Sequence, residues 1–111
     1  MNAYEVVITP DAEADLRQIR DYIAYGIDAR KNALAQVRAI RQAMEGLRTF
    51  PARNRLMDEE PWKSRGIRRL LVRNYFIYYR IDEGAGRVYV LNVIFARRDQ
   101  VRAITQHRTD R

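Results

Sequence analysis

The chain has 111 residues, which suits one domain over residues 1–111 that can bury a core without disulfides or metal. It contains no cysteine, which excludes disulfides and cysteine-ligated zinc. Twenty-one Lys and Arg residues against fourteen Asp and Glu residues give a formal net charge of +7. We therefore expect an anionic partner, either nucleic acid or an acidic protein segment.

Residues 1–5 lack the basic start of a signal peptide, and no stretch has the apolar length of a membrane span. We expect a cytoplasmic protein without a membrane partner, cofactor or metal. Lys31 and Lys63 are the only lysines, so arginine supplies nearly all of the positive charge. Arginine suits the recognition of phosphate and carboxylate, but a genome rich in G and C would produce the same bias. Both explanations stay open.

The first half of the chain predicts a strand and two helices. Residues 4–9 form a short run rich in β-branched residues, which predicts a strand. Thr9, the last residue of this run, is expected to cap a helix that begins at Pro10. Apolar residues spaced by three and four continue this helix towards Gly26. A second apolar stripe predicts a helix from near Asp28 to just before Phe50 and Pro51. The short connection makes the two helices an antiparallel hairpin.

The second half of the chain predicts a β meander. After a polar loop over residues 51–66, three β-type runs follow at 67–72, 76–81 and 88–95. The last run is almost entirely apolar, which is typical of a strand covered on both faces. Residues 99–107 are expected to form a short terminal helix. The predicted fold is α+β, in the order β-α-α-β-β-β with an optional helix, and its helical hairpin packs on a small, mostly antiparallel sheet.

Four groups of residues, in this order, resemble the RelE/ParE superfamily of toxins from bacterial type II toxin–antitoxin systems. They are the opening strand with Thr9-Pro10, Ala14-Asp15-Leu16 and Asp21-Tyr22-Ile23-Ala24; the helix end at Leu47, Phe50 and Pro51; Gly66-Ile67-Arg68-Arg69-Leu70 with the run from Asn74 to Asp82; and the run from Val90 to Asp99, which ends in Arg97-Arg98-Asp99. Together they span most of the chain.

The resemblance implies a growth-inhibiting toxin that a cognate acidic antitoxin neutralises. It implies one of two targets: DNA gyrase for ParE-like members, or mRNA on the ribosome for RelE-like members. Two positions favour the ParE-like alternative. Phe76 stands where RelE has an arginine, and Ile104 falls near the tyrosine of the RelE terminal segment. The enzymatic alternative is a metal-independent endoribonuclease.

Metal-free RNA cleavage needs a base, an acid, and cations around the phosphate. If the chain is a nuclease, the candidate catalytic residues are Arg68, Arg98 and Tyr75; packing within the sheet is the alternative role of Tyr75. Further arginines are candidates for binding the target or the antitoxin: Arg65, Arg69, Arg73, Arg80 and Arg97. On the first of the three strands, Arg69 and Arg73 are expected to share one face and Arg68 to point to the other.

Overall fold

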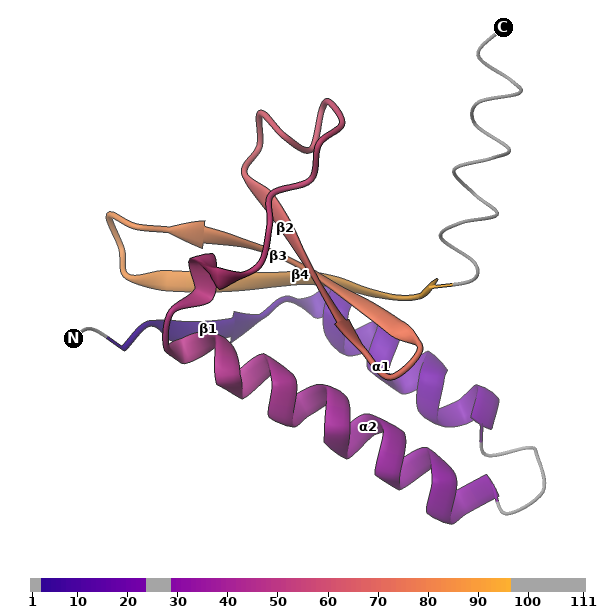
Figure 1. Ribbon diagram of the computed structural model, residues 1–111. Helices are drawn as coiled ribbons and strands as arrows, with labels where there is room; N and C mark the ends of the chain where they lie inside the picture. Colours follow the sequence, from indigo (N-terminus) through magenta and orange to yellow (C-terminus); the bar gives the residue numbers. More distant parts are fainter. Residues whose placement is uncertain (1–2, 24–28, 97–111) are drawn as a thin grey trace, which may run out of the picture.

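The computed structural model describes residues 3–23 and 29–96, and it confirms the predicted order of elements (Figure 1). The strands and helices are β1 (Glu5–Ile8), α1 (Pro10–Ile23), α2 (Ala29–Glu45), β2 (Ile67–Val72), β3 (Tyr75–Asp82) and β4 (Arg87–Phe95). Two 3-10 turns, η1 (Gly46–Arg48) and η2 (Pro51–Arg53), follow α2. None of the helices in the described ranges is long and apolar enough to cross a membrane.

The start of α1 confirms the predicted cap. The Thr9 hydroxyl oxygen accepts the Ala12 N–H at 3.3 Å, which satisfies one of the free donors of the first helical turn. The same hydroxyl donates to the Val90 carbonyl at 2.7 Å. One side chain therefore both begins the helix and joins it to β4.

The two helices lie side by side and antiparallel, as predicted (Figure 1). An ion pair links them, with 2.9 Å between Arg41 Nη2 and Glu13 Oε1. The second helix ends before Phe50 and Pro51, as predicted: its α-helical part ends at Glu45, and the chain then tightens into η1. The expected helix end at Gly26 lies outside the described residues.

The four strands form one sheet in the order β1-β4-β3-β2. The meander β2-β3-β4 is antiparallel, and β1 pairs with β4 in parallel. A register shift separates Tyr78, which pairs with Asn92, from Tyr79, which pairs with Val90. Leu91 is therefore the extra residue of a β-bulge.

The helices cover one face of the sheet, and we call the opposite side the open face. The core between the helices and the covered face contains Ala12, Leu16, Ile19, Ile40, Met44, Leu47, Ile77, Tyr79, Val88, Val90 and Val93. Along β4, the prediction that both faces are covered is wrong. Val88 and Val90 are buried, whereas Tyr89 and Leu91 are only half-buried, because no helix of the described residues lies over the open face.

Four further predictions need correction or lie outside the described residues. The 51–66 segment is not entirely irregular, since it contains η2 and a bridge between Leu56 and Arg68. Arg73 does not lie on the strand with Arg69. It occupies the turn between β2 and β3 with a φ of 56°, a value incompatible with a strand. Tyr75 begins β3 instead of belonging to the connection. The expected helix at 99–107 lies beyond the described ranges.

Candidate functional site

The open face of the sheet carries arginines stacked on aromatic rings. The Arg69 guanidinium carbon lies 4.0 Å from the centre of the Phe76 ring, and that of Arg80 lies 4.5 Å from the centre of the Tyr89 ring. Tyr78 lies between them, with 6.2 Å between its ring centre and that of Phe76. Such contacts hold each guanidinium group over an aromatic ring.

The register explains why these side chains meet. Arg69 pairs directly with Tyr78 on β3, and Arg80 follows Tyr78 by two residues, so all three project from the same side. Sequence alternation places Phe76 on this side as well. Arg69 also reaches the rim of a hollow of about 340 Å³, lined by Arg55, Leu56, Met57, Asp58, Glu59 and Arg69. The open face thus combines two of the predicted binding arginines, Arg69 and Arg80, with flat apolar surface.

Arg68, a predicted catalytic residue, lies on the covered face. Its Nη1 donates to the Asn54 carbonyl at 2.6 Å and to the Ala52 carbonyl at 3.2 Å. Since Arg68 pairs with Tyr79 in the sheet, its guanidinium extends over the edge towards the loop that contains η2. The contacts of this arginine are therefore with the backbone of the chain itself.

Tyr79 holds the same loop from the interior. Its side chain is fully buried, and its hydroxyl donates to the Pro51 carbonyl at 2.6 Å while accepting from Asn54 Nδ2 at 3.0 Å. Burial raises the pKa of the Tyr79 phenol above its ordinary value, although the Asn54 hydrogen bond and the nearby positive charge of Arg68 act in the opposite direction. The phenol is accordingly a neutral structural donor at physiological pH.

Tyr75, the other described catalytic candidate, lies far from Arg68. It packs on Phe95, with 5.5 Å between the ring centres. Arg68 is opposite Tyr79, four residues along β3, which corresponds to roughly 13 Å at the strand rise. Arg68 and Tyr75 therefore do not converge on one phosphate.

The remaining predicted binding residues are dispersed. Arg65 precedes β2 and Arg73 follows it, so they lie at opposite ends of that strand. Arg97 and Arg98 fall outside the described residues. Of the eight predicted site residues, the structure brings together Arg69 and Arg80 on the open face.

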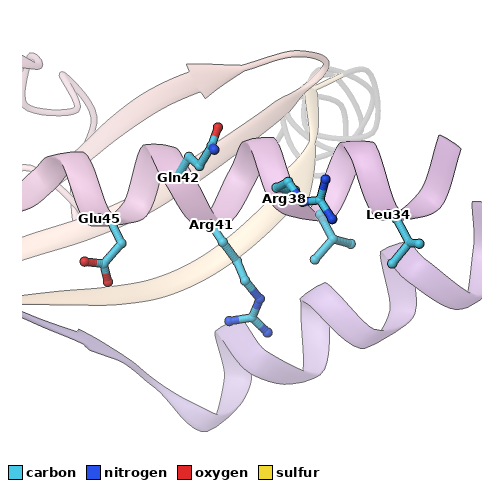
Figure 2. Close-up of a pocket in the computed structure, with 6 residues that line it drawn as sticks. Leu34, Arg38, Arg41, Gln42 and Glu45 are labelled. Carbon is cyan, nitrogen blue, oxygen red and sulfur yellow. The ribbon is translucent and has the colours of Figure 1, made fainter. Parts of the chain in front are cut away.

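A second surface lies on α2 (Figure 2). A shallow hollow of about 450 Å³ is lined by Leu34, Val37, Arg38, Arg41, Gln42 and Glu45. Leu34 is 54% exposed at one end of it, and the Arg41 side chain extends towards α1, where it pairs with Glu13. An apolar floor beside arginines suits an amphipathic segment that carries acidic residues.

Sequence reasoning missed the rings of the open face and the contacts around Tyr79. Strict alternation over residues 76–80 was a usable signal, because it separates Phe76, Tyr78 and Arg80 from Ile77 and Tyr79. The partners of Arg68 had no such signal, since they are backbone carbonyls of a loop 14 and 16 residues away.

The order of elements and the strand order define a small basic α+β protein with a helical hairpin on one face of a four-stranded sheet. The sequence model of the family described as "ParE toxin of type II toxin-antitoxin system, parDE" matches residues 6–100. This match covers most of the chain, and the chain therefore belongs to the ParE toxin family.

Solved structures show the same fold. The chromosomal ParDE toxin–antitoxin system from P. aeruginosa matches with a TM-score of 0.69 and 21% identity over 84% of this chain and 96% of that chain. The toxin–antitoxin complex RelBE2 from Mycobacterium tuberculosis matches with a TM-score of 0.62 and 23% identity over 84% of this chain and 98% of that chain. A mutant of the E. coli toxin RelE in the free state matches with a TM-score of 0.59 and 14% identity over 91% of this chain and 92% of that chain. No curated protein sequence matches significantly.

Proposed function

We propose that this toxin arrests growth by binding and inhibiting DNA gyrase, without chemistry of its own. The observation that carries the proposal is the position of Arg68. This candidate for phosphate chemistry is bonded to the Ala52 and Asn54 carbonyls, and it lies about 13 Å from Tyr75 along the sheet. Membership of the ParE family supports the same target, because the resemblance implies gyrase for ParE-like members.

The neutralising partner in this proposal is a cognate antitoxin with an acidic segment, and both proteins act in the cytoplasm. Two surfaces suit such a segment. The open face presents Arg69 and Arg80 on aromatic rings, and the hollow on α2 presents Leu34 beside Arg38 and Arg41 (Figure 2). Complementary charge would speed the encounter of the two proteins, and the apolar contacts would slow their dissociation.

Purified toxin and gyrase test the target directly. Addition of the toxin should inhibit supercoiling of relaxed plasmid and should increase the amount of linear, gyrase-cleaved DNA. Toxin co-purified with the acidic product of the neighbouring open reading frame is the matched control and should have neither effect. Unchanged supercoiling at a toxin excess, with a folded protein by circular dichroism, would rule out gyrase as the target.

The second candidate function is a RelE-like mRNA endonuclease. The alternation of Arg69, Phe76, Tyr78 and Arg80 favours it, since exposed RNA bases stack on aromatic rings and guanidinium groups. Primer extension on transcripts from induced cells distinguishes the two functions. Cuts at fixed codon positions would support the nuclease, and intact transcripts in arrested cells would support the binding inhibitor.

A further inference from the structure

Phe50 combines exposure with backbone strain. Its side chain is 72% exposed, more than that of any other large apolar residue in the described ranges. Its φ of 51° and ψ of 53° are left-handed values, which disfavour residues with a bulky side chain. The following proline would ordinarily give Phe50 an extended backbone. Burial of the Phe50 side chain therefore does not compensate for the strain of its backbone, which points to a role other than the folding of the chain.

The segment that carries this ring, residues 48–54, is called the Phe50 loop, and it is held from both sides. The Tyr4 N–H donates to the Arg48 carbonyl at 2.7 Å before the ring. After the ring, the Tyr79 hydroxyl donates to the Pro51 carbonyl, and the Arg68 guanidinium donates to the Ala52 and Asn54 carbonyls, at 2.6 to 3.2 Å. These contacts hold the backbone on both sides of Phe50, so its Cα–Cβ bond keeps one direction.

The surroundings of the ring are basic. Residues 46–57 contain three arginines, Arg48, Arg53 and Arg55, and no acidic residue. The Arg53 guanidinium donates to the Thr49 carbonyl at 3.2 Å, directly beside the ring-bearing residue. Arg48 and Arg55 each have an acidic neighbour, Glu45 at 2.8 Å and Asp58 at 3.8 Å, but all four of these side chains remain more than half exposed.

We infer that the Phe50 loop is the surface with which this toxin engages its target, with Phe50 inserted into an apolar pocket of a folded protein whose rim is acidic. An aromatic side chain on a backbone that is already held in place loses little conformational entropy on binding, and buried aromatic anchors dominate the energy of protein interfaces. The arginines around it supply the charge complementarity. The inference rests on the proposed function in so far as it requires a toxin with a protein target.

A folded target fits this loop better than the flexible segment of an antitoxin. An exposed aromatic side chain on a held backbone is buried best in a preformed pocket, which a folded protein offers. A flexible acidic segment instead fits grooves and flat faces, and the chain offers those on α2 and on the open face. If those two surfaces bind the antitoxin, the Phe50 loop remains available for the target.

The first test uses Phe50→Ala and Phe50→Asn in the full chain. Asparagine tolerates left-handed backbone, so it removes the ring while relieving the strain. Both variants should keep the melting temperature within about 4 °C of the wild type. Both should lose growth arrest on induced expression, and their affinity for the target should fall on the order of thirtyfold, as for an interface anchor. Phe50→Trp should retain arrest because it restores a large ring.

Trp62→Ala is the matched control, because it removes another exposed aromatic side chain from a neighbouring loop. It should arrest growth as the wild type does. Tyr79→Phe tests the positioning role of the hydroxyl, since it releases the Pro51 carbonyl while leaving the Phe50 ring intact. This variant should weaken arrest without changing co-purification with the neighbouring-gene product.

The outcomes separate the inference from the proposed function. Folded Phe50 variants that arrest growth like the wild type overturn the inference. So do variants that no longer co-purify with the neighbouring-gene product, because the loop would then contact the antitoxin. Loss of an RNA-cleaving activity in these variants would assign the loop to nucleic acid and would also overturn it. A wild-type chain without effect on growth would instead refute the proposed function, and the inference with it.

Discussion

Arg68 and Arg69 are consecutive in the sequence, but their side chains lie on opposite faces of the sheet. Arg68 extends from the covered face and satisfies carbonyls of the Phe50 loop, whereas Arg69 lies on a Phe76 ring on the open face. The period of two along a strand produces this separation. Two consecutive basic residues in a strand therefore need not share a role, because one bonds to the backbone of a loop while the other lies on the open face.

The same contrast holds for the two faces as wholes. The covered face buries aliphatic side chains and one tyrosine whose hydroxyl has two partners. On the open face the Phe76 and Tyr89 rings are half-exposed under arginines, whereas Tyr78 is buried. Substitutions on the first face should mainly change stability, and substitutions on the second should mainly change binding.

The largest expected difference comes from apolar truncations on the two faces. Ile77 is fully buried, so Ile77→Ala should cost about 2–5 kcal/mol of unfolding free energy through lost burial and a residual cavity. Leu71 is 57% exposed, and Leu71→Ala should change stability by no more than about 0.5 kcal/mol. Urea unfolding of both variants measures the difference. Equal destabilisation would mean that the open face is covered in solution.

The arginine pair gives the next largest effect. Arg68→Ala leaves the Ala52 and Asn54 carbonyls without their donor and should cost about 1–3 kcal/mol. Arg69→Ala loses a ring contact and should cost less than about 1 kcal/mol. The comparison is made by denaturant midpoints at constant m-value. A larger loss of stability in Arg69→Ala than in Arg68→Ala would contradict the prediction.

Charge removal on the open face should weaken antitoxin binding. The double variant Arg69→Ala/Arg80→Ala should lose about tenfold or more in affinity for the neighbouring-gene product, equivalent to ~1.4 kcal/mol, and its affinity should depend less steeply on salt. The variant Arg17→Ala/Arg20→Ala removes the same charge from exposed positions of α1 and serves as the control. Equal losses in both variants would indicate a general charge effect without a defined surface.

The smallest effect concerns the ion pair between the helices. The hydrogen bond from Arg41 lowers the pKa of Glu13 below its ordinary value of 4.5. The folded state therefore binds this proton more weakly than the unfolded state, so the stabilisation is present above about pH 4.5 and is lost as pH falls through the lowered pKa. Since both side chains are partly exposed, it should stay below about 1 kcal/mol.

Unfolding of wild type and Glu13→Gln at pH 7 and pH 3 measures this contribution. The two proteins should differ at pH 7 and converge at pH 3. In an Arg41→Gln background, Glu13→Gln should have little effect at either pH. A difference that persists unchanged at pH 3 would contradict the assignment.

Much of the fold could be predicted because local patterns agreed with the tertiary structure. The apolar spacing of α1 and the Thr9 cap define a helix start that the hydrogen bond to Ala12 realises. Alternation over residues 76–80 likewise separates the two faces of β3. Family resemblance then placed these elements in the correct class, which the family match over residues 6–100 confirms.

The parts that could not be predicted depend on long-range contacts or on unusual backbone. Alternation failed at Arg73, because a left-handed φ of 56° turns the chain before that residue could join Arg69. The left-handed backbone of Phe50 contradicts the usual effect of a following proline. The partners of Arg68 became visible only when the loop and the strand were placed together.

The parallel pairing of β1 with β4 has a consequence for biosynthesis. Glu5 and Arg87 are neighbours across this pair although they are 82 residues apart in the sequence. In the described part of the chain, β1 has no other strand beside it, so its backbone donors lack a strand partner until β4 has been synthesised. Contacts of such long range close late. The four-stranded sheet therefore cannot be completed on the ribosome before its last strand has been made.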